Sequence, residues 1–113
     1  MSIAILEIDS IVTKVVLSGR IDLARAMAID MPMSVVGGSR RAVVIDLSAV
    51  DFIASMGLRS VVMAAKAIQG KLGRVVLLAP QPAVEDVIRT AGIDELIPIF
   101  HDESAAVAAV RPS

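Results

Sequence analysis

Two short apolar runs, each followed by a segment with helical periodicity, constrain the fold of this chain most strongly. The runs are Arg41–Leu47 and Arg74–Ala79, and each fits a buried central strand. Apolar residues recur at helical spacing after each run, which predicts helices with one face on a core. They are Leu58, Val61, Val62, Ala65, Ile68 and Leu72 after the first run, and Val84, Val87, Ile88 and Ala91 after the second. Strands that alternate with helices predict an α/β domain with a mostly parallel sheet.

The N-terminal segment predicts how this sheet begins. Two β-rich stretches, 3–8 and 11–18, are separated by Asp9-Ser10, which is short enough for a hairpin and therefore predicts an antiparallel pair. Residues 19–22 break the strand pattern, and Asp22 can cap a helix that begins near residue 23.

The first predicted helix contains a proline. Leu23, Met27 and Met31 should share one of its faces. Pro32 removes a backbone donor and clashes one turn back, so we expect a kink or an early end there, with Gly37-Gly38 as the exit.

The remaining elements follow from turn residues. Gly73 can end the second helix, Pro80-Gln81-Pro82 follows the second apolar run, and Gly92 can end the third helix. A short strand at 95–100 and a last helix at about 104–110 complete the chain. We therefore predict one domain over residues 1–113, with a core of about 3–110, about five strands and about four helices.

Composition excludes several classes of function. The net charge of −1 offers no basic surface for nucleic acid, and we expect no direct binding to it. The chain has no cysteine, which excludes disulfides, thiol catalysis and cysteine metal sites, and suits a cytoplasmic protein. No apolar stretch reaches 18 residues and no signal peptide is evident, so we expect no membrane insertion.

The stretch 51–58, Asp-Phe-Ile-Ala-Ser-Met-Gly-Leu, is the main candidate site. Ser55 lies where a loop is expected to become a helix, and serine is a preferred N-cap residue there. The same position suits an added phosphate, because unpaired N–H groups and the helix dipole favour negative charge. From this stretch alone, a structural cap is the simpler interpretation.

A second stripe follows on the same helix. Met56, Ser60, Met63 and Ala67 recur at helical spacing outside the core stripe, and Arg59 and Lys66 lie beside them. Exposed methionines adapt well to a binding partner. Packing under a neighbouring element is an equally open alternative, since buried and exposed apolar stripes look alike in sequence.

Other residue patterns predict no catalytic, cofactor or metal site. His101 is the only histidine, beside Asp102 and Glu103, and a solvated loop is favoured over a metal site. Asp46 and Asp51 have no nucleophile–histidine pair near them, and Asp46 fits the end of a strand. Residues 37–39 form a turn rather than a phosphate-binding loop. A two-component receiver domain would need clustered acids after its first strand, and Asp9 stands alone.

Several segments together resemble the STAS domain, the family of bacterial anti-sigma factor antagonists. They are Ser-Gly-Arg-Ile-Asp at 18–22, Val-Ile-Asp-Leu-Ser at 44–48, Phe-Ile-Ala-Ser-Met-Gly-Leu at 52–58, and Ala-Gly-Ile at 91–93 followed by Leu-Ile at 96–97. The resemblance extends from about residue 3 to about residue 110. The sequence departs from the family pattern at Ala54, where aspartate is common, and at Met56, where serine or threonine is common.

This resemblance implies a phosphorylation switch. It makes Ser55 the target of a serine kinase of the histidine-kinase-like ATPase type, which is also the anti-sigma factor. The expected partner-binding residues are Asp22, Ala54, Ser55, Met56, Gly57, Arg59, Ser60 and Met63.

Two functions remain open. In the first, the unphosphorylated protein binds the anti-sigma factor, which frees a sigma factor for transcription, and the phosphorylated protein releases it. In the second, the chain is an adaptor subunit of a lipid-transport ABC system, and Ser55 is only a helix cap. A small enzyme is a weaker third possibility. The sequence leaves the oligomeric state open.

Overall fold

A five-stranded sheet in the order β1-β2-β3-β4-β5 is the frame of the computed structural model, which describes residues 2–112. In chain order the elements are β1 (Ile3–Glu7), β2 (Thr13–Ile21), α1 (Leu23–Ser39), β3 (Ala42–Ile53), α2 (Ser55–Gly70), β4 (Arg74–Leu78), α3 (Pro82–Thr90), α4 (Ile93–Leu96), β5 (Ile99–Phe100) and α5 (Glu103–Val110). Strand β1 is antiparallel to β2, and all other neighbouring pairs are parallel. The predicted α/β fold with an antiparallel N-terminal pair is confirmed. The predicted domain limits, 1 and 113, lie outside the described residues.

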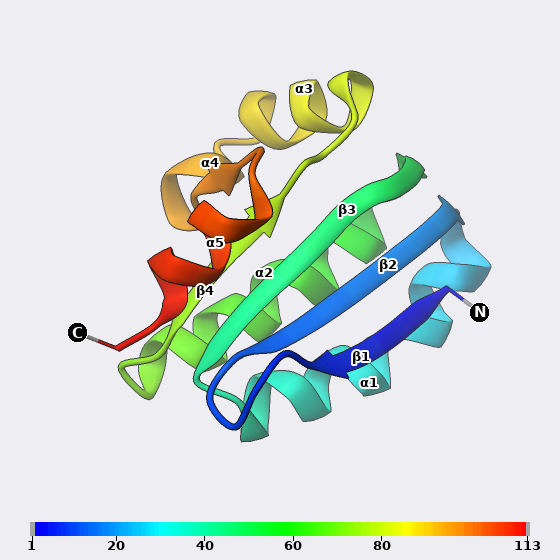
Figure 1. The fold of residues 1–113 in the computed structure, drawn as a ribbon. Helices are drawn as coiled ribbons and strands as arrows, with labels where there is room; N and C mark the ends of the chain where they lie inside the picture. Colours follow the sequence, from blue (N-terminus) through cyan, green and yellow to red (C-terminus); the bar gives the residue numbers. More distant parts are fainter. Residues whose placement is uncertain (1, 113) are drawn as a thin grey trace.

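Helices cover the two faces of the sheet unequally. Helices α1 and α2 lie behind the sheet in Figure 1, whereas α5 lies in front of it, over β3 and β4. The larger core fills the α1–α2 side and includes Leu17, Ile45 and Ile68. A smaller core under α5 includes Val44 and Val110. No helix among residues 2–112 is both long and apolar enough to cross a bilayer.

Strands β2 and β3 are longer than the sequence pattern predicted. Residues 19–21 were expected to break the strand, but they belong to β2 and pair with β3 as far as Ile53. The register shifts on both sides of Gly19, whose φ is +86°, a conformation that glycine adopts easily. The irregularity therefore bends the strand pair without ending it.

Helix α1 continues through Pro32 to Ser39, so the predicted early end and the Gly37-Gly38 exit are wrong. Burial explains why the helix persists: Ile29 and Met33 are fully buried on either side of the proline. At Gly37, an added Cβ would lie 3.0 Å from Cα of Ala64 in α2. Packing of α1 on the core and on α2 therefore outweighs the local cost of the proline.

The predicted apolar face of α2 is only partly confirmed. Val61, Ala65 and Ile68 are buried, whereas Leu58 and Val62 are half-buried. Leu72 is 88% exposed, because the helix ends at Gly70 and the chain then turns through a left-handed residue at Leu72 (φ 64°). Gly73 lies after this turn and does not end the helix itself.

The C-terminal third contains one more helix than predicted. Val84 and Ile88 of α3 are buried, while Val87 and Ala91 are exposed. Gly92 adopts φ 75° directly before α4, the short helix that takes up the first part of the predicted 95–100 strand. Only the last two residues of that stretch form β5.

Candidate functional site

Ser55 is the first residue of α2, and a single residue, Ala54, separates it from β3. The N–H of Ala54 donates to the carbonyl of Ile21 at the end of β2 (N···O 2.8 Å). The carbonyl of Ala54 accepts from the N–H groups of Gly57 and Leu58 at 2.9 and 3.1 Å. The N-cap is therefore Ala54, and the predicted cap at Ser55 is wrong. The cause is the length of β3, which runs to Ile53 where a loop was expected.

The hydroxyl of Ser55 does not cap helix α2. Helix α2 has no side-chain hydrogen bond at its N-terminus, and Ser55 is exposed. The first N–H groups of a helix lack acceptors within the helix, so they and the helix dipole favour an anion at this position. This arrangement leaves the oxygen accessible to a modifying enzyme and suits the phosphate that would result.

Gly57 seats the first turn of α2 on the sheet. It is buried, and an added Cβ would lie 2.9 Å from Cγ2 of Ile21 and 3.0 Å from Cγ1 of Ile53. The helix therefore approaches the ends of β2 and β3 as closely as the missing side chain allows. Gly57 positions Ser55 through the backbone and presents no side chain to a partner.

Asp22 occupies the matching position on the neighbouring strand. It follows β2 and caps α1, with Oδ1 accepting from the N–H of Arg25 at 3.1 Å. The predicted cap is confirmed. Because β2 and β3 are parallel neighbours, the N-termini of α1 and α2 follow the same edge of the sheet.

A groove of about 630 Å³ runs between α1 and α2. Met56 and Met63 on its α2 side are 45% and 57% exposed, and Met27 on its α1 side is 68% exposed. The methionine stripe thus faces solvent rather than packing under another element. The lining residues are Ala26, Met27, Asp30, Ser34, Gly37, Met56, Arg59, Ser60, Met63, Ala64 and Ala67.

Ser60 joins the two walls of this groove. It is only 6% exposed, and its Oγ donates to Oδ1 of Asp30 in α1 at 2.7 Å. It also lies 3.3 Å from the carbonyl of Met56, one turn earlier. Ser60 therefore belongs to the floor of the groove, where it fixes the spacing of α1 and α2.

The structure gathers most of the predicted partner-binding residues at one site and adds lining residues that sequence reasoning missed, most of them in α1. Met56, Arg59, Ser60 and Met63 line the groove, and Ser55 lies just before them on α2. Met27 and Asp30 form part of the opposite wall. The signal for Met27 was present in the shared face of Leu23, Met27 and Met31, all of which are exposed.

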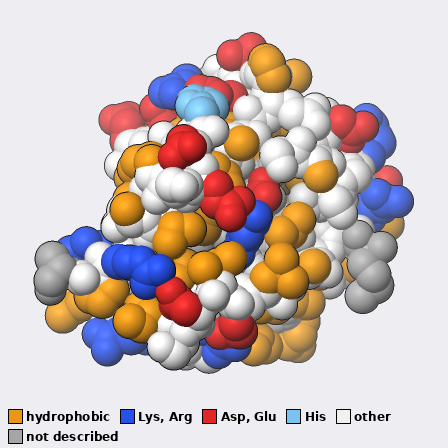
Figure 2. All heavy atoms as spheres, viewed as in Figure 1, with side chains coloured by type: hydrophobic (Ala, Val, Ile, Leu, Met, Phe, Trp, Pro, Cys, Tyr) orange, Lys and Arg blue, Asp and Glu red, His pale blue; other side chains and the backbone are white. Residues whose placement is uncertain are grey.

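Asp46 and Asp51 do not form an acid–base pair. Asp46 lies within β3 rather than at a strand end and is 8% exposed. Its Oδ2 is 3.5 Å from Nζ of Lys14, which also contacts Oε1 of Glu103 at 2.6 Å. The hydrogen bond to Glu103 raises the pKa of Lys14, so the lysine stays charged. The contacts of Lys14 with Asp46 and Glu103 join α5 to the sheet. Asp51 is exposed and takes no part in them. Figure 2 shows acidic and basic side chains close together on this face, with hydrophobic ones around them.

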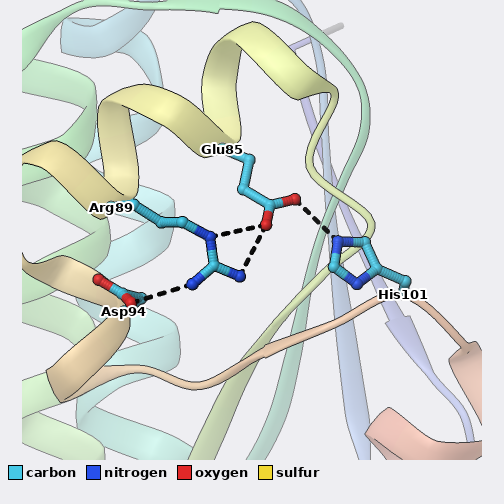
Figure 3. A network of polar contacts seen from close by, with 4 residues as sticks. All are labelled: Glu85, Arg89, Asp94 and His101. Atoms are coloured by element: carbon cyan, nitrogen blue, oxygen red, sulfur yellow. Dashed lines mark hydrogen bonds and ion pairs between the residues drawn. The ribbon is translucent and has the colours of Figure 1, made fainter.

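His101 lies in an exposed loop, as predicted, and it also has a partner that the sequence did not indicate. Its Nε2 lies 2.8 Å from Oε1 of Glu85 in α3, whose other oxygen contacts Arg89 at 2.7 Å (Figure 3). Arg89 reaches on to Asp94 in α4 at 3.2 Å. Hydrogen bonds from His101 and Arg89 lower the pKa of Glu85. The network braces α3, α4 and the segment after β5, and residues 2–112 contain no cluster of three potential metal ligands.

Comparison with known proteins gives a consistent result. The family model of the STAS domain matches residues 2–106. BtrV of Bordetella bronchiseptica, named as a candidate anti-sigma factor antagonist, is 32% identical over 96 residues, 84% of this chain and 83% of that protein. An anti-sigma factor antagonist from Mycobacterium paratuberculosis is 34% identical, with a TM-score of 0.83 and coverage of 98% and 96%. The Bacillus cell fate determinant SpoIIAA in its phosphorylated form shares the fold, with 19% identity, a TM-score of 0.72 and coverage of 91% and 95%.

Proposed function

This chain belongs to the STAS domain family, and we propose that it is an anti-sigma factor antagonist switched by phosphorylation of Ser55. In the unphosphorylated state it binds an anti-sigma factor that is also a serine kinase of the histidine-kinase-like ATPase type. Binding frees the sigma factor for transcription in the cytoplasm. The protein then acts by binding and release as a single domain over residues 1–113, without a catalytic site or cofactor of its own.

The observation that carries this proposal is the exposed hydroxyl of Ser55 beside the groove. Ser55 has no capping hydrogen bond, and the methionines of α2, Met56 and Met63, follow it on the same helix. A partner that covers the start of the groove would also cover Ser55. Support for phosphorylation in this fold comes from SpoIIAA, for which a phosphorylated form exists.

The switch needs one phosphoryl transfer. The kinase partner transfers the γ-phosphoryl group of ATP to Oγ of Ser55, ADP leaves, and the hydroxyl proton is lost to solvent. The phosphate adds about −1.5 to −2 charges, which the N-terminus of α2 accommodates with a stabilisation of roughly 0.3–1 kcal/mol. In an interface, the same uncompensated charge costs several kcal/mol. Phosphorylation therefore leaves the fold intact and releases the partner.

Affinity capture from the native cell, followed by mass spectrometry, identifies the partner and the modification state of Ser55. Titration of that partner then compares wild type, Ser55→Asp and Ser55→Ala. We expect Ser55→Asp to fold normally and lose the partner, and Ser55→Ala to bind like wild type but to resist release by ATP. Because Ser55 caps nothing, the alanine variant should keep the thermal stability of wild type within about 0.5 kcal/mol.

Ser104→Asp is the matched control, since Ser104 is an exposed serine in the first turn of another helix, α5. It adds the same charge away from the groove and should bind like wild type. Equal affinities for wild type, Ser55→Asp and Ser55→Ala would refute the switch. Capture of a lipid transporter instead of a kinase would support the adaptor function.

A further inference from the structure

A second cavity, of about 640 Å³, lies at the amino ends of β3 and β4. Its size is within the range of about 300–1,000 Å³ typical of small-molecule sites. Ala42, the first residue of β3, lines it, whereas Ser55 lies beyond the other end of the same 12-residue strand. The lining residues are Glu7, Ser10, Ile11, Thr13, Ser39, Arg40, Arg41, Ala42, Leu72, Gly73, Arg74, Val110 and Pro112. The cavity is thus separate from the groove between α1 and α2.

The charged residues that line this cavity carry a net positive charge. Three arginines line it, and Glu7 is the only carboxylate among the lining residues. Main-chain carbonyls hold two of the guanidinium groups in place: Nη2 of Arg41 donates to Lys71 O at 2.7 Å, and Nη1 of Arg74 donates to Arg111 O at 2.9 Å. A guanidinium fixed in this way is preorganised for an anion.

Arg40 is the third arginine, and one of its donors has no acceptor. Its Nη2 lies 3.2 Å from Oε1 of Glu7, and its side chain is 40% exposed. The Nε atom is buried and has no hydrogen-bond acceptor among residues 2–112. The Nε–H and Nη–H edge of arginine binds two oxygens of a carboxylate or phosphate side by side. Because Nε is buried, binding an anion through this edge requires the side chain of Arg40 to rotate toward the cavity.

Two exposed apolar side chains, Leu72 and Ile11, also line the cavity. Leu72 is 88% exposed and adopts φ 64°, a conformation unusual for a residue with a branched side chain. Ile11 is 50% exposed, and Pro112 with the core residues Ala42 and Val110 completes the apolar lining. An exposed leucine in a left-handed turn adds nothing to the core, whereas it would cover the apolar part of a ligand.

We propose that this cavity binds a small amphipathic organic anion. Its carboxylate or phosphate group lies at Arg40 and Arg41, and its apolar body lies between Ile11 and Leu72. The site is independent of Ser55 and of the partner-binding groove.

The test follows backbone amide shifts by NMR during titration with four probes: octanoate, octyl phosphate, 1-octanol and acetate. Octanoate or octyl phosphate should bind saturably and shift the amides of Arg41, Leu72 and Gly73, and their relative affinity separates a carboxylate ligand from a phosphate ligand. Octanol lacks the charge and acetate lacks the apolar body, so each should bind at least about tenfold more weakly.

Variants complete the test. Arg41→Gln and Leu72→Asn should each weaken binding of the better anion about tenfold, and asparagine tolerates the left-handed turn, so Leu72→Asn should still fold. Arg59→Gln, on the groove between α1 and α2, is the matched control and should bind like wild type, as should Ser55→Asp. Absence of saturable binding by both anions would overturn the proposal. So would anion affinities unchanged in Arg41→Gln and Leu72→Asn, or shifts confined to other surfaces.

Discussion

At the scale of single residues, the candidate site depends on a missing side-chain cap at Ala54 and on the missing side chain of Gly57. Ser55 is available because Ala54 occupies the cap position and has no side-chain hydrogen bond. Gly57 lets the first turn of α2 lie against Ile21 and Ile53. The backbone around Ser55 is therefore fixed by packing, while its hydroxyl is exposed.

The first prediction compares two glycines. Gly57→Ala should lower the free energy of unfolding by about 1–3 kcal/mol, because the new Cβ overlaps the side chains of Ile21 and Ile53. Gly38→Ala is the control: it lies within helix α1 with nothing within 4 Å of an added Cβ, and should raise the free energy of unfolding by roughly 0.5–1 kcal/mol. Urea unfolding measures both. A Gly57→Ala variant as stable as wild type would show that α2 can shift away from the sheet.

At the scale of secondary-structure elements, α1 and α2 act as a pair. Gly37 lies against the backbone of Ala64, and the hydrogen bond from Ser60 to Asp30 joins the helices above this contact. Each helix buries one face on the core and leaves methionines on the groove side. The groove is therefore a consequence of close helix packing at small residues, with flexible side chains on its rim.

The second prediction uses methionines from the two environments. Met63→Glu should change the free energy of unfolding by no more than about 0.5 kcal/mol, since the side chain is 57% exposed, while it weakens binding of the captured partner. Met33→Glu places a charge at a fully buried position of α1 and should prevent stable folding. Thermal unfolding and partner titration check both variants. A large loss of stability in Met63→Glu, or unchanged partner affinity, would contradict the docking role of the groove.

At the scale of the whole molecule, polar contacts join the two ends of the chain. Asp9, in the turn between β1 and β2, contacts Nη2 of Arg111 through Oδ2 at 2.6 Å. Its other oxygen accepts from the N–H groups of Ile11 and Val12 at 2.8 Å each. Hydrogen bonds from the Val12 N–H, from Arg111 and from the Ile11 N–H lower the pKa of Asp9 from 3.8 to about 2.

The third prediction concerns acid stability. The folded-state pKa of Asp9 lies below its ordinary value, so the unfolded state binds more protons between those two values. Its contribution is present above about pH 4 and is lost as the pH falls toward about 2. Asp9→Asn should therefore make unfolding less dependent on pH in this window, as measured by denaturant unfolding at a series of pH values.

Arg111→Gln separates the causes of this effect. It removes the ion pair but keeps the backbone hydrogen bond from Val12, which is the largest cause of the shift, so its pH dependence should lie between those of wild type and Asp9→Asn. If the loss of unfolding free energy at low pH were identical in all three proteins, the acid sensitivity would come from other carboxylates, such as Glu85.

The sequence by itself determined the class of fold and the position of Ser55 at the start of a helix. Apolar runs such as Arg41–Leu47 report burial on both faces of a strand, and part of the cap and periodicity signals survives in the structure. Asp22 caps α1 as its side chain predicts, and Ser55 lies at the start of α2. The resemblance to STAS domains rested on the same local segments.

Only the tertiary structure decided which local signals were overridden. Pro32 lies inside α1 because the residues around it are buried against the sheet and α2. Ser55 is not the cap, since pairing of β3 with β2 continues to Ile53 and moves the start of the helix. The exposure of Met56 and Met63 depends on where α1 lies. The second cavity, at the amino ends of β3 and β4, is lined by residues from Glu7 to Pro112. These features arise from contacts between residues that are distant in sequence. A local sequence pattern does not report the free energies of such contacts.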